Sequence, residues 1–332
     1  MTASLPEFAL ARPHDIATAI ATRRGHPSSR FIAGGTDILV NVRHGITKPE
    51  LLIDLSGIAE LAGIGADESG VRIGAGTSIA SLARNAVLAT RYCGLTEAAE
   101  GVAGPGHRAM GTVGGNLCLE TRCIYYNQSE WWRHANGFCL KHLGDICHVA
   151  PQGKRCHAAY TGDLAAALLA LDATVEIAGT QCGRQIPLAE LYVEDGRAHL
   201  ALADDEIVLA VHLPPNPPLS AYAKVRARGA IDYPLAGVAV ALKATDGVAT
   251  AIRIGLTGTN SKPFLLAGTV PLLGRPIDER ALQEIERLVQ KQVQPMRTTT
   301  ASAHYRRLAA AALARRLTAA LFAKANAKPS TG

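Results

Sequence analysis

The chain has 332 residues, of which 48% are hydrophobic, and a formal net charge of +6. This length predicts one large domain or two to three modest ones, and no apolar run reaches the ~18 residues that span a bilayer. Basic residues are spread along the chain instead of forming one stripe. That pattern argues against nucleic-acid binding and leaves an anionic ligand or an acidic partner protein. The N-terminal segment lacks a basic region followed by an apolar core, so we expect no secretion signal and a cytoplasmic protein.

The first part of the chain predicts short elements separated by turns. A helix is expected over residues 15–23, with Asp15 at its cap. Residues 30–45 predict an apolar strand, a glycine turn and a second apolar segment. Further elements follow in order: short strands at 51–58 and 71–79, helical spacing at 78–89, and a helix from 97 that breaks into a glycine-rich loop before 116.

The last part of the chain has clearer periodicity. Residues 162–179 predict an apolar helix and then a strand, and the Pro-rich junction 213–220 predicts a linker. Three strands are expected beyond it, at 221–229, 236–244 and 249–259. Asp278 can cap a helix that carries Leu282, Ile285 and Leu288 on one face. A final helix is expected to pack through an apolar stripe and to keep its arginines solvated, the stripe being Tyr305, Leu308, Leu313, Leu317 and Leu321.

Residues 118–160 differ in character from the rest. This segment holds both tryptophans and five of the seven cysteines, with four of them, Cys123, Cys139, Cys147 and Cys156, in its aromatic-rich part, and it has poor helical or strand periodicity. A loop that long inside a compact domain is usually functional or disordered. It therefore predicts an insertion that needs something other than an apolar core to order it.

Four cysteine ligands suit a cubane iron–sulfur cluster or a structural zinc. The gaps between them are fifteen, seven and eight residues, and no C-x-x-C pair occurs, so neither a zinc ribbon nor a common ferredoxin run fits. Incidental buried cysteines remain an alternative, as does zinc with help from His134, His142, His148 or His157. A cluster is favoured by the aromatic residues that could screen it from water, Tyr125, Tyr126, Trp131, Trp132 and Phe138. Cys93, Cys118 and Cys182 are left over, with Cys118 the nearest alternative ligand.

Two glycine pairs follow apolar segments, in Ala33-Gly34-Gly35-Thr36-Asp37 and in Thr112-Val113-Gly114-Gly115-Asn116. Neither matches a dinucleotide-binding or P-loop motif. Paired glycines let the main chain approach an anion and present N–H groups to it. Nearby short polar side chains suit phosphate or ribityl contacts. The loops therefore favour a phosphate-bearing cofactor, with plain turns as the alternative.

The segment from Phe31 to Asp37 resembles the first flavin-binding loop of the medium subunits of the xanthine dehydrogenase family, and Thr112 to Asn116 resembles the second. The resemblance runs over nearly the whole chain. Most such subunits pass from the second loop almost directly to an Asp-Leu element, here Asp163-Leu164. The cysteine segment inserted before that element resembles the one found in the 4-hydroxybenzoyl-CoA reductase branch of the family.

The resemblance implies an α+β fold in two domains. Residues 1–214 would form a two-lobed FAD-binding domain of the vanillyl-alcohol oxidase (PCMH) type, with the insertion 118–160 carrying a cluster. Residues 218–325 would form a small α+β domain with an antiparallel sheet.

The resemblance also implies the cofactors and their residues. Cys123, Cys139, Cys147 and Cys156 would bind a [4Fe-4S] cluster. FAD would be held by Arg30, Phe31, Ile32, Ala33, Gly34, Gly35, Thr36, Asp37, Val102, Thr112, Val113, Gly114, Gly115, Asn116, Asp163, Val208 and Lys224. Some of these residues also have plain structural explanations: Val102 and Val208 as core, Lys224 as a solvated strand residue, and Asp163 as a helix N-cap.

The implied function is electron transfer. Ferredoxin would reduce the cluster, and electrons would pass through FAD to [2Fe-2S] centres on a small subunit and to molybdenum on a large molybdopterin subunit. There 4-hydroxybenzoyl-CoA would be dehydroxylated to benzoyl-CoA. The assembly would be a dimer of heterotrimers, and this chain would hold no substrate-transforming residue. Three alternatives stay open: a related molybdenum hydroxylase that passes electrons outward, a zinc-stabilised nucleotide-binding scaffold, and a stand-alone FAD oxidoreductase.

Overall fold

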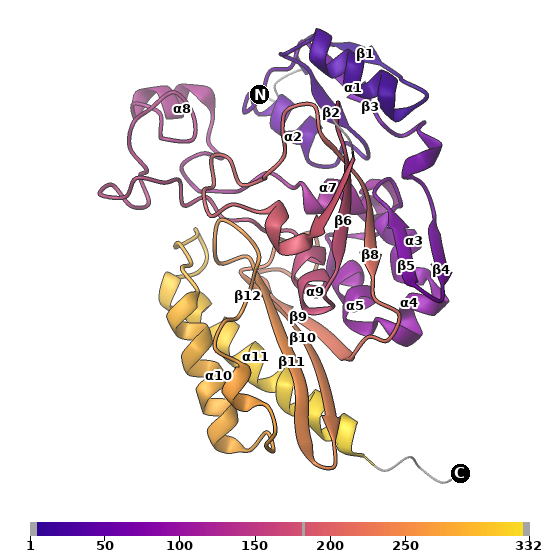
Figure 1. Ribbon diagram of the computed structural model, residues 1–332. Coiled ribbons are helices and arrows are strands. Elements are labelled where there is room, and N and C mark those ends of the chain that lie inside the picture. Colours follow the sequence, from indigo (N-terminus) through magenta and orange to yellow (C-terminus); the bar gives the residue numbers. More distant parts are fainter. Residues whose placement is uncertain (1–4, 181–182, 328–332) are drawn as a thin grey trace.

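The computed structural model describes residues 5–180 and 183–327. The chain forms a small N-terminal lobe, a larger helix-and-sheet lobe and a C-terminal sheet backed by two helices (Figure 1). None of the helices in these ranges is both long and apolar enough to cross a bilayer.

The N-terminal lobe is a three-stranded parallel sheet in the order β1-β3-β2, with two helices. Asp15 caps α1 as predicted, because its carboxylate accepts the N–H of Thr18 at 2.7 Å. The first glycine loop directly follows the end of β2 and leads into α2. The elements are β1 (Ala9–Ala11), α1 (Ile16–Gly25), β2 (Arg30–Ile32), α2 (Ile38–Arg43) and β3 (Leu51–Asp54).

The second lobe is a five-stranded antiparallel sheet in the order β4-β5-β8-β6-β7, covered by short helices. The helical spacing predicted at 78–89 forms two helices, because Asn85 ends the first and caps the second by accepting the N–H of Leu88 at 3.1 Å. The strands are β4 (Ile64–Asp67), β5 (Gly70–Gly74), β6 (Thr174–Ala178), β7 (Arg184–Pro187) and β8 (Ile207–Leu213). The helices are α3 (Ile79–Arg84), α4 (Ala86–Arg91), α5 (Cys93–Gly101), α6 (Pro105–Met110), α7 (Val113–Leu117) and α9 (Leu164–Ala170), with 3₁₀ turns at Ala59–Leu61 and Leu188–Leu191.

Residues 118–160, all of which the structure describes, contain a single short helix, α8 (Glu130–Ala135). The two ends of this insertion pair with each other, since Arg122 and Ala159 exchange backbone hydrogen bonds at 2.7 and 2.8 Å. Figure 1 shows the insertion projecting beside the N-terminal lobe. The predicted irregularity of this segment is therefore observed.

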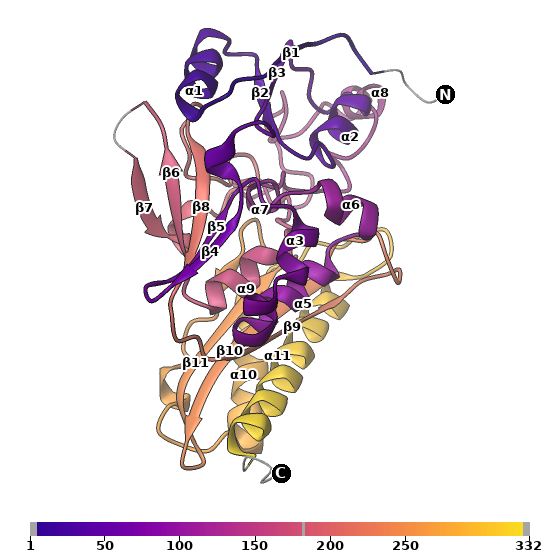
Figure 2. The ribbon, with the colours of Figure 1, turned by 90° about the vertical axis from the view of Figure 1, so that its right-hand side faces the viewer.

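The C-terminal sheet is antiparallel, in the order β12-β11-β10-β9, and both of its faces are covered. Successive residues of a strand point to opposite faces. Val238, Val240 and Leu242 of β10 join the core formed with α10 and α11, while Ala239 and Ala241 join the core of the second lobe. Figure 2 shows α11 running along the sheet. The elements are β9 (Leu219–Val225), β10 (Ala236–Thr245), β11 (Val248–Thr257), β12 (Phe264–Leu265), a 3₁₀ turn at Val270–Leu272, α10 (Glu279–Gln292) and α11 (Ala303–Asn326).

Helix α10 matches its prediction, whereas α11 corrects one. Asp278 caps α10 by accepting the N–H of Ala281 at 2.9 Å. In α11, Tyr305 and Leu308 are exposed, so the predicted apolar stripe fails at its N-terminal end. The arginines of α11 were expected to be solvated, but Arg306 is buried. Its guanidinium donates to the carbonyl oxygens of Leu235, Gly258 and Met296. The same burial lowers the pKa of Arg306 to about 10.

We predict that Arg306→Met destabilises the protein strongly. The substitution removes the donor from three carbonyl oxygens without letting water reach them, and an orphaned buried acceptor costs ~1–3 kcal/mol. The free energy of unfolding, measured in urea, should fall by at least ~3 kcal/mol. Arg316→Met, at an exposed position of the same helix, is the matched control and should change it by under ~0.5 kcal/mol. Equal urea midpoints for the two variants would contradict the structural role given to Arg306.

Candidate functional site

The two glycine loops lie against each other. The first loop, 33–37, connects β2 to α2, and the second, 112–116, enters α7. A β-carbon at Gly34 would overlap the carbonyl oxygen of Met110, just before the second loop. One at Gly111 would lie 3.5 Å from the hydroxyl of Thr36. The missing side chains therefore allow two segments far apart in sequence to touch.

The backbone N–H groups of the two loops are used differently. In the first loop, the N–H groups of Gly34, Gly35, Thr36 and Asp37 donate to no acceptor among the described residues. In the second loop, by contrast, Gly114 donates to the carbonyl of Ala75 at 2.7 Å and Gly115 to the hydroxyl of Thr112 at 3.1 Å. The first loop thus offers a row of donors to an anion, whereas those two amides of the second are already engaged.

A buried ion pair joins two other predicted flavin residues. The ammonium of Lys224 lies 2.8 Å from the carboxylate of Asp163, which also accepts the hydroxyl of Tyr222 at 2.7 Å. Burial raises the pKa of Asp163, and the nearby Lys224 opposes that rise. Lys224 is therefore not a solvated strand residue, since only 5% of its side chain is exposed. Asp163 occupies the N-cap position of α9 without a side-chain cap bond, and Asn116 accepts the N–H of Leu164 instead, at 3.1 Å.

The loop between β9 and β10, residues 226–235, connects these parts. Lys224 also donates to the carbonyl of Asp232 at 3.2 Å, and the hydroxyl of Tyr233 donates to Asp37 at 3.5 Å. The same loop reaches the segment after Val102, because Ile231 donates its N–H to the carbonyl of Ala103 at 3.2 Å. These contacts bring the two loops, the Asp163–Lys224 pair and the chain at Val102 together. Val208, on β8, lies instead in the apolar core of the second lobe.

Arg122 ties the cysteine insertion to the first glycine loop. Its guanidinium pairs with the carboxylate of Asp37, donates to the side-chain oxygen of Asn41 at 2.9 Å and lies 5.6 Å from the centre of the Tyr233 ring. Neither Arg122 nor Tyr222 is visible as a site residue in the sequence. The available signals are position alone: Arg122 precedes Cys123, and Tyr222 lies on the same strand face as Lys224.

All four predicted cluster cysteines line one small cavity. The volume of this cavity is about 10 Å³. Within the described ranges, no three His, Cys, Asp or Glu side chains are grouped closely enough to hold a single metal ion. Burial raises the pKa of Cys123, and that of Cys156 to about 11. The remaining lining residues are Tyr125, Tyr126, Leu140, Lys141, His148 and Val149.

Other predicted contributors lie elsewhere. Trp131 is 77% exposed, and Phe138 packs edge-on against His134 and His142 at 5.6 and 5.4 Å rather than lining the cavity. Cys118 is also absent from the cavity lining, and burial raises its pKa to about 12. Cys182 lies outside the described residues.

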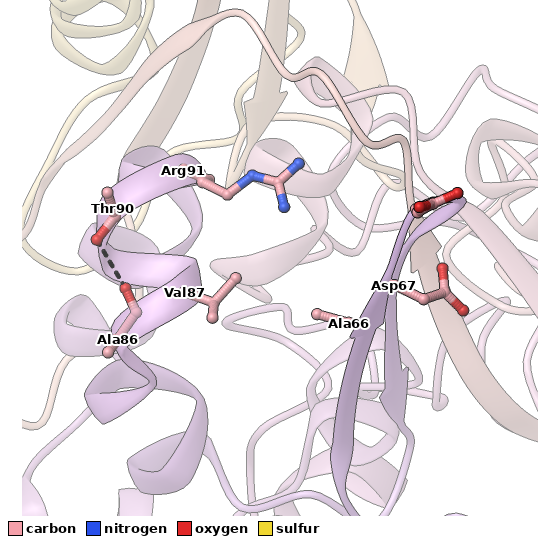
Figure 3. A pocket seen from close by; sticks show the side chains of 7 residues that line it. Ala66, Asp67, Ala86, Val87, Thr90 and Arg91 are labelled. Carbon is pink, nitrogen blue, oxygen red and sulfur yellow. Dashed lines mark hydrogen bonds between the residues drawn. The ribbon is translucent and has the colours of Figure 1, made fainter.

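A second, open pocket of about 670 Å³ lies between the β4–β5 hairpin and α4. Figure 3 shows Val87 and Arg91 of α4 on one side and Ala66 and Asp67 of β4 on the other. It contains none of the residues predicted to bind a cofactor. Hydrogen bonds from Ser69 hold the pKa of Asp67 below its ordinary value.

Comparison with known proteins agrees with this architecture. Residues 6–216 match the family of FAD binding domains in molybdopterin dehydrogenase, and residues 220–321 match the CO dehydrogenase flavoprotein C-terminal domain. The chain is 33% identical to the aldehyde oxidoreductase FAD-binding subunit PaoB of Escherichia coli (strain K12), over 77% of this chain and 83% of the relative. It is 26% identical to the xanthine dehydrogenase FAD-binding subunit of Escherichia coli O157:H7, over 89% of each.

A chain of reconstituted CO dehydrogenase from Oligotropha carboxidovorans has the same fold, with a TM-score of 0.78 and 27% identity over 96% of this chain and 99% of that one. The predicted fold class, a PCMH-type FAD-binding domain followed by a smaller C-terminal α+β domain, is confirmed. The chain belongs to the FAD-binding medium subunits of the xanthine dehydrogenase and CO dehydrogenase family.

Proposed function

We propose that this chain is the electron-transfer subunit of a cytoplasmic, molybdenum-containing 4-hydroxybenzoyl-CoA reductase. It would hold FAD and a [4Fe-4S] cluster and assemble with a large molybdopterin subunit and a small [2Fe-2S] subunit as a dimer of heterotrimers, with ferredoxin as donor. The observation that carries this proposal is that four cysteines far apart in the sequence line one cavity. Arg122, the residue before Cys123, pairs with Asp37 of the first glycine loop. FAD exchanges electrons singly or in pairs, which suits a relay between iron–sulfur centres.

The proposed FAD site is built from the two glycine loops with Arg30, Phe31, Ile32, Val102, Asp163, Val208 and Lys224. The row of unengaged N–H groups from Gly34 to Asp37 suits a phosphate. Lys224 and Asp163 would meet the ribityl and ring regions as a preformed pair. The domain limits 1–214 and 218–325 belong to the same proposal, supported by the end of β8 at Leu213 and the start of β9 at Leu219.

The cysteine cavity fits a cluster in two respects. Its lining includes all four cysteines, which is the number of thiolate ligands that a cubane requires. Its surroundings also lack an apolar core: between Cys123 and Arg155 the residues buried as a whole are Tyr126, Arg133 and Cys147, and the side chain of Lys141 is buried as well. A bound cluster would supply the ordering energy that apolar burial does not.

The substrate would bind on a partner subunit, so its identity depends on the resemblance of the insertion to that of 4-hydroxybenzoyl-CoA reductases. A second candidate is a molybdenum enzyme that oxidises an aldehyde and passes electrons outward. It is favoured by the 33% identity to the aldehyde oxidoreductase subunit, against 26% for the xanthine dehydrogenase subunit.

The two candidates predict opposite reactions of the purified complex. With reduced ferredoxin, the first predicts loss of the phenolic hydroxyl of 4-hydroxybenzoyl-CoA and formation of benzoyl-CoA. The second predicts reduction of an artificial acceptor on addition of an aromatic aldehyde. Chromatography would monitor both substrates. Conversion of the aldehyde without any conversion of 4-hydroxybenzoyl-CoA would refute the reductase assignment and leave the cofactor assignment intact.

For the flavin site, we predict that Gly35→Ala lowers FAD content severalfold. Gly35 has φ +71°, a left-handed conformation that costs other residues ~1–2 kcal/mol, and relaxing it would misplace the row of N–H groups. Gly63→Ala is the matched control, with φ +89° and open space around the added carbon. Bound FAD is measured by absorbance after heat release. Gly114 is unsuitable for this test, because a β-carbon there would press on Ala75 at 2.9 Å whatever the ligand.

For the cluster, we predict four irons per chain in anaerobically purified protein and loss of the cubane signal in Cys139→Ser, with FAD largely kept. Cys93→Ser is the control, since Cys93 lies outside the cavity and its thiol donates to Ala89 at 3.2 Å. Iron is measured by elemental analysis and the cluster by electron paramagnetic resonance after reduction. Full iron in Cys139→Ser, or one zinc and no iron in the wild type, would overturn the ligand assignment.

A further inference from the structure

A buried cation lines the cysteine cavity. Lys141 belongs to the lining, only 4% of its side chain is exposed, and its ammonium lies 5.1 Å from the centre of the Tyr126 ring. No role in the flavin site or as a ligand accounts for this lysine, and a lysine is seldom buried without a specific set of partners.

The ammonium is held in a fixed position by three acceptors. Lys141 donates to the carboxylate of Glu120 at 2.6 Å, to the hydroxyl of Thr121 at 2.6 Å and to the carbonyl of Gly196. Gly196 in turn donates its N–H to the carbonyl of Cys156 at 2.9 Å. The charge and one of the proposed ligands are therefore fixed to the same short segment, which makes their separation a property of the fold.

The charge of Glu120 does not simply cancel that of Lys141. Glu120 is 40% exposed, so solvent screens its carboxylate more than it screens the ammonium. Arg133 is a second buried cation at the Tyr126 ring, 5.6 Å from its centre, but it does not line the cavity. Of the two partners in the Lys141–Glu120 pair only Lys141 lines the cavity, so the charged side chain at the cavity wall is a cation.

We propose that Lys141 is a positioning residue that raises the reduction potential of the cluster held by the four cysteines. This inference rests on the proposed function. A reduced cluster carries one more negative charge than an oxidised one, and a fixed cation in a poorly solvated site stabilises that charge. The two charges of the Lys141–Glu120 pair then have opposite effects on the reduction potential of the cluster. Removing the cation should disfavour reduction, and removing the carboxylate should favour it.

The test uses the anaerobically purified complex and three variants, with the midpoint potential of the cluster taken from a redox titration followed by electron paramagnetic resonance. Lys141→Met should shift the potential to more negative values, and Glu120→Gln to more positive values. Lys48→Met is the matched control, because Lys48, which lies outside the insertion, forms an exposed pair at 2.7 Å with Glu130 of the insertion. It should leave the potential unchanged.

Opposite signs for the two pair variants support the inference, since a merely structural disturbance would not reverse direction with the charge removed. Unchanged potentials, or shifts of the same sign, at full iron content would overturn it. If Lys141→Met loses iron, the decision passes to Glu120→Gln and to Lys141→Arg, which keeps the charge and should stay near the wild-type potential. Wild-type protein with FAD but without iron would overturn the proposed cluster and this inference together, whereas iron with unshifted potentials would overturn only the latter.

Discussion

The site depends on the ion pair between Arg122 and Asp37. Arg122 lies near the start of the cysteine insertion and Asp37 ends the first glycine loop, and their side chains are only 15% and 22% exposed. Breaking a buried pair by removing one partner costs ~3–5 kcal/mol, because the other charge is left without compensation. Both segments therefore have to fold in one relative position. The proximity of the proposed cluster and flavin sites follows from this one contact.

The two glycine loops contribute different things to that arrangement. The second loop is a structural support, because Gly114 donates its N–H to the carbonyl of Ala75 at 2.7 Å and Asn116 accepts the N–H of Leu164 at the start of α9. The first loop is half-buried and leaves its N–H groups for a ligand. Similar sequence patterns thus serve unlike purposes, because Ala75, directly after β5, supplies an acceptor to the second loop, whereas no described residue supplies one to the first.

Sequence patterns predicted what depends on local spacing. Caps at Asp15 and Asp278, the strands beyond the Pro-rich junction and the irregular insertion all follow from residues close together in the chain. Periodicity failed to predict the burial of a side chain where hydrogen-bond acceptors far away in the sequence decide it. In α11, Arg306 is buried because three carbonyl groups from other segments accept its hydrogen bonds. The partners of Asp37 and Asp163 escaped prediction for the same reason, since Arg122 and Tyr222 meet them only after folding.

The insertion shows how a segment can be ordered without a core. Trp131 and Leu143 are 77% and 80% exposed, so its large apolar side chains are not what holds it together. Polar anchors at its edges do part of that work: Arg122 reaches Asp37, Lys141 reaches Gly196, and Arg133 donates to the carbonyl of Gly45 at 2.8 Å. One of these anchors, Lys141, also lines the cavity of the four cysteines. Under the proposed function, a cluster bound by these thiols would supply further stability, and cofactor binding would then be coupled to the folding of the insertion.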